Sequence, residues 1–343
     1  MKEHVTIKDI ARLCGVSVST VSRVINHSPA VNEATRARVL QAIERMNYSP
    51  NPAAKALISK KSRLLGVIVP NLNHSVISRM VKGITQEAQK AGFDVLLFDY
   101  DNDPRIEVRQ LELLGEKVLD GVISINSIAP AGLLLDLQQK LPLVLLERTL
   151  DGMELGTVQT DDDFGMKLLV SHLVELGHHT IGMLTGEVGT YSADRRTHYF
   201  LEHVSRFLPD FPVQDYLMDC AWSMQGGFVG LHELIRMRPD VTAVVCANDQ
   251  IALGALGCAH QLGFSVPQEL SIVGFDNFDE SQYSVPPLTT LSFPAQRVGE
   301  TAVKFLIERI LNPNCPRHSR VLPLTLLQRK STAPPRQESL LQL

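Results

Sequence analysis

Four side chains between residues 18 and 23 have the chemistry needed to read base pairs. An Arg can donate two hydrogen bonds to guanine, a Ser hydroxyl can donate or accept one, and a Val methyl can contact the methyl group of thymine. Helical spacing of the apolar residues buries the opposite face of this stretch. The alternative is that these are ordinary solvated surface residues. The exposed set is Val18, Ser19, Ser22 and Arg23, and the buried set is Val21, Val24 and Ile25.

A helix-turn-helix must position these side chains. Apolar residues at helical spacing predict a first helix at about 6–13, which Gly15 ends by supplying a turn with positive φ. Ser17 can cap the second helix. A third helix at about 33–46 completes a compact three-helix unit. Two short helices joined by a Gly-containing turn form the motif that places its second helix in the major groove.

The stretch after Tyr48, SPNPAAKALISKKSR, has two readings. Pro50 and Pro52 prevent the third helix from continuing, and residues 53–58 are good helix formers but too few to form a stable helix alone in water. The stretch is therefore either a linker or a helix that forms only on DNA. In the second case Lys55 would lie near phosphates and Leu57 could wedge into a minor-groove base step.

The charge distribution supports a nucleic-acid partner for this end of the chain. The net charge of −4 hides an asymmetry, because residues 1–63 hold 11 basic and 4 acidic side chains, a net of +7. The other 280 residues hold 22 basic and 33 acidic side chains, a net of −11. A small basic head on a large acidic body is expected when one end of the chain binds a polyanion.

From Leu64 the pattern changes to apolar, β-rich runs that alternate with helical ones. This alternation predicts an α/β body with two lobes, each a doubly wound parallel sheet covered by helices on both faces. The expected domains are a helix-turn-helix unit at 1–49, a hinge and linker at 50–63, and a body at 64–330. The tail at 331–343 is too short for a coiled coil, so we expect it to be disordered and the protein to be a dimer.

Polar side chains follow many of the predicted strands. A single Asn or Asp after a strand is usually a helix N-cap, but ligands of doubly wound sheets bind beyond the carboxyl ends of the strands. So many strand ends fit a polar cleft between lobes better than independent caps. The residues are Asn71, Asp99, Asn126, Glu147 and Arg148, Asp161 and Asp162, Asn248 and Asp249, and Asp276 and Asn277.

Trp222 is the only tryptophan. Its ring would suit the apolar face of a sugar in such a cleft, or it could be a core residue. His178 and His179 enter a predicted strand and point to opposite faces, so we expect a structural role and no shared metal ion.

The sequence gives no support for an enzyme, a membrane protein or a secreted protein. The chain has no Gly-rich phosphate loop, no GxSxG and no HExxH motif, so we expect no catalytic residues, metal or cofactor. No run is apolar and long enough for a membrane span. Charges break the N-terminal region where a signal peptide would need an apolar core, and the five cysteines form no ligand pattern. We therefore expect a cytoplasmic protein with reduced thiols.

The sequence TIKDIARLCGVSVSTVSRVINHSPAVNEATRARVLQAIERMNYSPNPAAKAL closely resembles the DNA-binding head and hinge of the LacI/GalR family of bacterial repressors. The resemblance implies that Val18 and Ser19 begin the recognition helix, that Arg23 contacts the operator and that Leu57 intercalates. It departs from the family pattern at Cys14, usually Ala, and at Lys55, usually Arg. The full implied DNA-binding set is Thr6, Val18, Ser19, Thr20, Ser22, Arg23, Asn26, Asn51, Ala54, Lys55 and Leu57.

The resemblance extends through the body to about residue 330, carried by VQTDDDFG, AVVCANDQIALGAL and VPQELSIVGFDNF. It implies a fold similar to a periplasmic sugar-binding protein, with two lobes and three crossovers near Asp161, Leu291 and Leu322. Arg196, Asn248 and Asp276 match positions that contact the effector in the family. The full implied effector set is Asn126, Glu147, Arg196, Trp222, Asn248 and Asp276.

Three departures concern the effector. The family's Asn, Pro and two Phe after the first body strand are replaced by His74, Ser75, Val76 and Ile77, which removes an aromatic wall. Glu147 replaces the family's usual Asp, and Tyr199 replaces the usual Gly. With Trp222 retained, these changes favour a sugar or sugar phosphate over a purine-like ring, and Arg195 beside Arg196 would suit a phosphate.

The resulting expectation is a ligand-responsive repressor of a carbohydrate-utilisation operon, which binds a near-palindromic operator as a homodimer. Two other classes share parts of the pattern. A periplasmic or membrane-associated sugar-binding protein would share the body but would need a signal peptide in place of the basic head. A doubly wound enzyme would need a nucleophile, a metal set or a phosphate loop.

Overall fold

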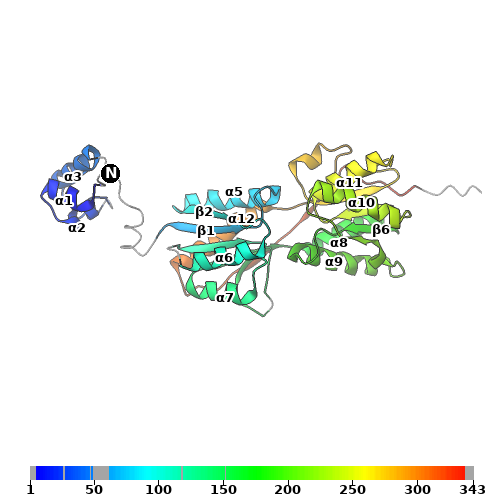
Figure 1. The fold of residues 1–343 in the computed structure, drawn as a ribbon, viewed down its shortest axis with the longest axis horizontal. Helices are drawn as coiled ribbons and strands as arrows, with labels where there is room; N and C mark the ends of the chain where they lie inside the picture. Colours follow the sequence, from blue (N-terminus) through cyan, green and yellow to red (C-terminus); the bar gives the residue numbers. More distant parts are fainter. Residues whose placement is uncertain are drawn as a thin grey trace, which may run out of the picture. The chain divides into compact units, whose positions relative to one another are not determined.

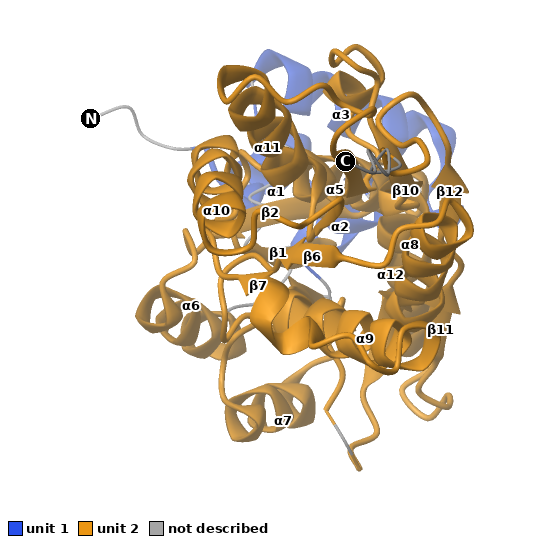
Figure 2. Ribbon diagram, turned by 90° about the vertical axis from the view of Figure 1, so that its right-hand side faces the viewer, with its two compact units in different colours: residues 1–62 blue, residues 63–343 orange. Residues whose placement is uncertain are grey.

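The computed structural model describes residues 5–25, 28–46, 48, 62–116, 119–150 and 152–336. The chain divides into two compact units, Met1–Ser62 and Arg63–Leu343 (Figure 2). We call the first unit the head and the second the body, and each is described by itself. Asn26, Asn51, Ala54, Lys55 and Leu57 lie outside the described residues, as does the segment predicted to be a hinge helix.

The head is the predicted three-helix unit. Its helices are α1 (Ile7–Cys14), α2 (Val18–Ile25) and α3 (Glu33–Arg45). Gly15 has φ 59° and ends α1, and the Ser17 hydroxyl accepts a hydrogen bond from the Thr20 N–H at the start of α2. A small core of its own holds the unit together, made of Ile10, Ala11, Cys14, Val21, Val24, Val39 and Ala42.

The first lobe of the body is built on a fully parallel six-stranded sheet with the order β11-β5-β4-β3-β1-β2. Helices α5 and α12 lie on one face of this sheet, and α6 and α7 lie on the other (Figure 1). The strands are β1 (Leu64–Val69), β2 (Asp94–Asp99), β3 (Gly121–Ile125), β4 (Leu143–Leu146), β5 (Gly156–Thr160) and β11 (Ser319–Leu322), and the helices are α5 (Ser75–Lys90), α6 (Pro104–Glu116), α7 (Ala131–Lys140) and α12 (Ala295–Leu311).

The second lobe repeats the plan with the order β12-β10-β9-β8-β6-β7. Helices α10 and α11 pack together on one face, and α8 and α9 pack together on the other (Figure 1). The sequence predicted a fully parallel sheet, but the edge strand β12 is antiparallel to β10, so this sheet is mixed. The strands are β6 (Ile181–Leu184), β7 (Leu217–Met218), β8 (Ala243–Cys246), β9 (Ser271–Asp276), β10 (Thr289–Ser292) and β12 (Thr325–Leu327), and the helices are α8 (Asp162–Glu175), α9 (Tyr191–Phe207), α10 (Met224–Met237) and α11 (Asp249–Gln261), with 3-10 turns at Val213–Tyr216 and Asp279–Gln282.

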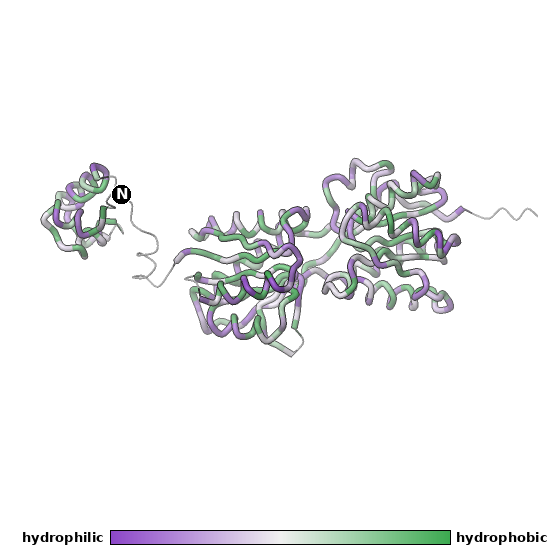
Figure 3. Tube along the Cα trace, viewed as in Figure 1, coloured by the Kyte–Doolittle hydropathy of each residue, from purple (hydrophilic) through white to green (hydrophobic). Residues whose placement is uncertain are grey.

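The chain passes between the lobes three times. The crossings follow β5, β10 and β11, which end at Thr160, Ser292 and Leu322. Hydrophobic residues run along the strands of both sheets (Figure 3), and a continuous cluster of buried side chains extends through both lobes. The two-lobed α/β fold expected from the sequence is confirmed.

The predicted disordered tail is wrong for residues 331–336. Ser331 is fully buried, where its hydroxyl donates to the Ile272 carbonyl and accepts from the Thr289 N–H. The Ala333 carbonyl accepts from His178 Nε2 or from the Ser271 hydroxyl. This segment therefore packs against the amino ends of β9 and β10. Residues 337–343 lie outside the described residues.

The two adjacent histidines lie on opposite sides of the chain, as predicted. His178 is buried and contacts Thr242, Ser271 and Ala333, whereas His179 is exposed. Within the residues that the structure describes, no three His, Cys, Asp or Glu side chains gather as a metal site would require. No helix in the described part of the chain is long and apolar enough to cross a membrane.

Ser331→Ala should lower the free energy of unfolding by about 1–3 kcal/mol, because it leaves the buried Thr289 N–H without a partner. Urea denaturation followed by circular dichroism measures the loss. Ser205→Ala, at an exposed position in α9, is the matched control and should change stability little. Equal stability of the two variants would show that the C-terminal segment is not part of the folded lobe.

Candidate functional site

The head presents the predicted base-reading side chains to solvent. Val18, Ser19 and Arg23 are exposed on α2, and Thr20 and Ser22 are half-buried. Both the Ser19 and Thr20 hydroxyls lie within hydrogen-bond distance of the Ser17 hydroxyl, at 2.7 and 2.8 Å. The surface thus has the composition that major-groove readout needs.

Thr6, the remaining described member of the DNA-binding set, lies at the start of α1. Its backbone N–H and its hydroxyl both donate to the Asp9 carboxylate. This bonding lowers the pKa of Asp9, because hydrogen bonds favour the ionised form. Thr6 therefore fixes the first turn of the head in addition to any contact with a phosphate.

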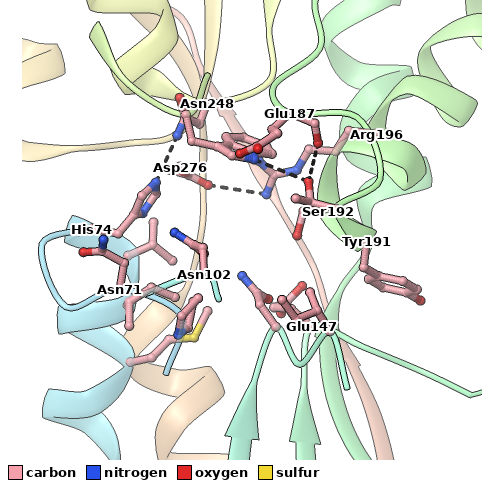
Figure 4. Close-up of a pocket in the computed structure, with 18 of the residues that line it drawn as sticks. Asn71, His74, Asn102, Glu147, Glu187, Tyr191, Ser192, Arg196, Asn248 and Asp276 are labelled. Atoms are coloured by element: carbon pink, nitrogen blue, oxygen red, sulfur yellow. Dashed lines mark hydrogen bonds and ion pairs between the residues drawn. The ribbon is translucent and has the colours of Figure 1, made fainter. Parts of the chain in front are cut away.

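The body contains a cavity of about 180 Å³, lined by side chains from both lobes (Figure 4). All six residues of the predicted effector set line it. The first lobe contributes Pro70, Asn71, His74, Val76, Ile77, Met80, Tyr100, Asn102, Asn126, Ile128 and Glu147, and the second contributes Glu187, Thr190, Tyr191, Ser192, Arg196, Trp222, Asn248 and Asp276, with Phe293 at the second crossing.

Asn126 and Glu147 lie side by side on the floor of the first lobe. They directly follow the paired strands β3 and β4, and both have positive φ, 49° and 53°, which turns the chain sharply at the sheet edge. Glu147 Oε2 accepts a hydrogen bond from the Thr160 hydroxyl at 3.0 Å, whereas Glu147 Oε1 and Asn126 Oδ1 are buried without partners. Burial, together with the nearby Asp162, raises the pKa of Glu147 to about 7.

Arg196 joins the pocket to the core of the second lobe. Its guanidinium lies over the Phe275 ring, 3.6 Å from the centroid, and donates to the Ala247 carbonyl. Nη2 lies 3.5 Å from the Asp276 carboxylate, and the two side chains face each other in Figure 4. Asp276 is fully enclosed, and the cost of its burial exceeds the attraction of Arg196, which raises its pKa to about 8.

Asn248 connects the lobes directly. Its Oδ1 caps α11 by accepting from the Ile251 N–H, and its Nδ2 donates to His74 Nε2 of the first lobe at 3.1 Å. His74 therefore carries its proton on Nδ1, which has no partner. Burial and the two nearby arginines lower the pKa of His74 to about 4, so its ring is neutral at pH 7.

Trp222 forms one wall of the pocket and rests on a glycine. A Cβ at Gly186 would lie 2.6 Å from Trp222 Cζ2, and Gly186 has φ 78°, so both space and backbone require glycine here. The indole Nε1 lies 3.4 Å from the Thr190 hydroxyl. The ring is partly buried and faces the pocket, so the reading as a pure core residue is wrong.

Other strand-end residues have structural roles instead. Asp161 caps α8 by accepting from the Phe164 N–H, and Asp249 accepts from the Phe278 N–H and the Ser281 and Thr290 hydroxyls. For these residues the ordinary cap or loop-bracing interpretation is correct. Among the predicted strand ends, Asn71, Asn126, Glu147, Asn248 and Asp276 line the pocket, whereas Asp99, Arg148, Asp161, Asp162, Asp249 and Asn277 do not.

Arg195 does not line the pocket, so it does not provide the phosphate contact that the sequence suggested. Its Nε donates to Asp162 at 3.0 Å, Nη1 donates to Gln159 at 2.8 Å, and Nη2 donates to the Thr160 carbonyl. Nη2 also lies 3.7 Å from the Glu147 carboxylate. The side chain is therefore bonded to Asp162 of α8 and to Gln159 and Thr160 of β5 in the first lobe.

Sequence reasoning missed the loop after β6 and the start of α9. Glu187 and Thr190 in the loop and Tyr191 and Ser192 in the first turn of α9 line the pocket, but this segment has no periodic pattern that would mark it. The one available signal was its position directly after a buried strand, because strand ends of this sheet edge face the cleft. His74 was noted only as a departure from a family pattern, and its contact with Asn248 joins residues far apart in sequence.

Two family descriptions match the chain. "Bacterial regulatory proteins, lacI family" matches residues 6–51, and "Periplasmic binding protein-like domain" matches residues 170–332. The first covers the helices of the head. The second covers most of the second lobe.

Curated relatives match almost from end to end. The HTH-type transcriptional repressor PurR of Aliivibrio salmonicida is 32% identical over 329 residues, covering 95% of this chain and 98% of the relative. The HTH-type transcriptional regulator GalR of Escherichia coli is 32% identical and covers 97% of both chains. The ribose operon repressor of Haemophilus influenzae is 30% identical and covers 95% and 98%.

Solved structures of related regulators also match the chain over most of its length. The lac repressor dimer bound to operator and the anti-inducer ONPF matches with a TM-score of 0.87 and 28% identity, covering 96% of this chain and all of that chain. A LacI family regulator from Enterococcus faecium with bound ribose matches with a TM-score of 0.71 and 30% identity, covering 79% and 99%.

A helix-turn-helix head and a two-lobed body with a pocket between its lobes define a ligand-responsive, DNA-binding transcriptional regulator. The chain belongs to the lacI family of bacterial regulatory proteins.

Gly186→Ala should displace Trp222, because the new methyl group would overlap the indole ring. Trp222 is the only tryptophan, so its emission maximum reports the change directly. Gly189→Ala is the matched control, since Gly189 also has positive φ, 87°, but no neighbouring atom lies within 4 Å of the place its methyl group would take. A red shift in the first variant and none in the second is expected. Identical spectra would contradict this packing of Trp222.

Asp276→Asn should change how stability depends on pH. The raised pKa of Asp276 means that the folded state favours its protonated form, so its stabilising effect is present below about pH 4 and is lost as pH rises to about 8. Relative to the wild type, the free energy of unfolding of the variant should therefore rise by up to about 1.4 kcal/mol per pH unit between pH 5 and 8.

Urea titrations at several pH values measure this difference. Asp279→Asn, at an exposed position three residues further on, is the control and should follow the wild-type curve. A difference between Asp276→Asn and wild type that stays constant across the range would show that Asp276 is ionised throughout.

Proposed function

We propose that the protein is a cytoplasmic, homodimeric repressor of a carbohydrate-utilisation operon. Its two heads bind the half-sites of a near-palindromic operator, and a monosaccharide held between the lobes of the body sets the operator affinity. The observation that carries the proposal is the pocket between the lobes, which all six expected effector residues line from both sides. The proposal assigns no catalytic step, metal or cofactor to the chain.

The size and lining of the pocket support a monosaccharide. A cavity of about 150 Å³ binds benzene, so a cavity of about 180 Å³ accommodates one six-membered ring. A monosaccharide ring is of that size. Amide, hydroxyl and carboxylate groups surround an apolar wall of Val76, Ile77, Met80 and Trp222, which matches a ring with polar edges and apolar faces.

The relatives also support a sugar as the class of effector. One matched structure holds ribose, another is a complex of the regulator CelR with cellobiose, and one curated relative is a ribose operon repressor. PurR relatives match as well, but an aromatic wall for a flat ring is replaced here by Val76 and Ile77. We therefore favour a sugar effector.

Transmission from the pocket to the head requires two states of the body. The lobes are joined by the Asn248 contact with His74 and by a hydrogen bond between Thr149 and the Tyr191 hydroxyl at 2.8 Å. A ligand that binds one arrangement of the lobes better shifts the equilibrium toward it, with a typical coupling of about 1–3 kcal/mol. The hinge segment at 50–63 would then order or release the heads on DNA.

Arg23→Ala should weaken binding to the specific operator by about 1–3 kcal/mol, because it removes a side chain placed to bond a base. A gel-shift titration at fixed salt measures the loss. Arg45→Ala removes the same charge from the last turn of α3 and is the matched control. Equal losses in both variants would mean that Arg23 contributes only charge and does not read a base.

Asn126→Gly should abolish most of the effector response while preserving operator binding. The residue has positive φ, which glycine accepts, and its Oδ1 has no partner within the protein, so the fold loses little. Asn73→Gly, at an exposed position outside the pocket, is the control. Operator release is followed by gel shift with the sugar found by thermal-shift screening. A normal response in Asn126→Gly would remove this residue from the site.

A further inference from the structure

We propose that the effector of this pocket is a monosaccharide without an anionic group, and that the site rejects the phosphate ester and the uronic acid of the same sugar. This inference rests on the proposed function and narrows it. The sequence left both a sugar and a sugar phosphate open. The structure distinguishes them by the charges that line the pocket and by what those charges already contact.

The pocket lining is acidic. Glu147, Glu187 and Asp276 line it, and Arg196 is the one cationic side chain among the described lining residues. His74 is neutral at pH 7, because its pKa is lowered to about 4. Burial raises the pKa of Glu147 to about 7 and that of Asp276 to about 8. At pH 8 a phosphate therefore meets Glu187 and the ionised Glu147 against the one positive charge of Arg196, and Asp276 adds to the negative charge only in part. At an effective dielectric of about 20, one unpaired negative charge about 6 Å away weakens the binding of an anion by about a hundredfold.

The single lining cation is already engaged. Arg196 Nη2 lies 3.5 Å from Asp276, Nε lies 3.6 Å from Asp162, and Nη1 donates to the Ala247 carbonyl. The Phe275 ring covers one face of the guanidinium. Phosphate recognition by Arg uses two parallel N–H donors that point at the ligand. Here Nη1 and Nη2 face a carbonyl and a carboxylate of the protein, and Nε lies near Asp162 without a hydrogen bond to it.

The neighbouring arginines are engaged as well. Arg195 is held by Asp162 and by first-lobe residues at the crossing. Arg79 donates to the carbonyls of Asp276 and Asn277 from outside the pocket, at 3.1 Å each. Arg148 donates to the Ser127 carbonyl. None of these three lines the cavity.

Helix N-termini are the one feature that would favour an anion. The side chains of Asp161 and Asn248 occupy those of α8 and α11, and Asp194 lies in the first turn of α9. Of the helices that begin within three residues of a lining residue, α5, α7 and α12 have neither a side-chain cap nor an acidic residue in the first turn. Each of these N-termini supplies only a partial positive charge of about half a unit, and Arg196 is the one cationic side chain among the described lining residues.

The buried polar atoms of the pocket that lack hydrogen-bond partners match the hydroxyl groups of a sugar. Glu147 Oε1 and Asn126 Oδ1 are acceptors without hydrogen-bond partners, and the N–H groups at His74 Nδ1 and Arg196 Nε are donors without one. A sugar hydroxyl can donate to the acceptors and accept from the donors. The oxygens of a phosphate dianion or a carboxylate only accept, so they would face Glu147 and Asn126 without a proton between them.

The test uses the full-length protein and matched sets of ligands. Each set contains an aldose, its terminal phosphate ester and its uronic acid, for the common hexoses and pentoses. Thermal shift identifies binders, and quenching or enhancement of Trp222 emission gives their affinities at pH 8, where Glu147, with a pKa of about 7, is ionised. We expect stabilisation by one or more free aldoses, with the phosphate and the acid of the same set bound at least about a hundredfold more weakly.

The outcomes separate this inference from the proposed function. If a phosphate ester or uronic acid binds as tightly as its parent aldose, or binds where the aldose does not, the inference is overturned and a sugar-class effector stands. If no member of any set binds, the sugar effector itself is wrong, and the inference fails with it.

A substitution tests the physical cause. Glu147→Gln preserves shape and removes one negative charge, so the ratio of phosphate to aldose dissociation constants should fall by about tenfold or more. Glu175→Gln, at an exposed position in α8, is the control and should leave the ratio unchanged. An unchanged ratio in Glu147→Gln would overturn the electrostatic basis of the selectivity.

Discussion

The geometry of the body depends on the carboxylate of Asp162, which two consecutive arginines share. Asp162 is only 3% exposed and is the first residue of α8, directly after the first crossing between the lobes. Consecutive residues of a helix point about 100° apart, so Arg195 reaches the first lobe while Arg196 reaches the pocket. Asp162 lies between the two guanidinium groups. It therefore joins a lobe contact and a ligand-facing side chain in one charged cluster.

Such a cluster contributes little net stability, because burying charges costs several kcal/mol per ion before their attraction is counted. Its effect is to fix the orientation of the side chains that face the pocket. Arg196 stays extended over Phe275 and toward Asp276, and Glu147 stays turned into the pocket, because each has a fixed partner behind it. Since Arg195 holds residues of the first lobe from a helix of the second, movement of the lobes must alter the same cluster that a ligand contacts.

The sequence predicted the fold, the head and the edge of the sheets where the pocket lies, because these follow from periodicity and from polar residues at strand ends. It could not separate Arg195 from Arg196, since adjacent residues on a helix differ in direction and not in composition. Asn248 shows a further limit, because it both caps α11 and binds His74, so the cap and cleft interpretations were never exclusive. The ordered segment at 331–336 was missed because Ser331 pairs with Ile272 and Thr289, far away in sequence.

The two parts of the chain have opposite net charges, and these charges bear on which ligand each part can bind. The segment that contains the head has a net charge of +7 and faces a polyanion, whereas the remaining 280 residues have a net charge of −11. The field of an acidic body lowers the local concentration of small anions around it, and an acidic cleft with low-dielectric walls strengthens this effect. An anionic effector would have to overcome both the overall field and the paired arginines. An uncharged sugar meets neither obstacle, and its hydroxyls supply the donors that Asn126 and Glu147 lack.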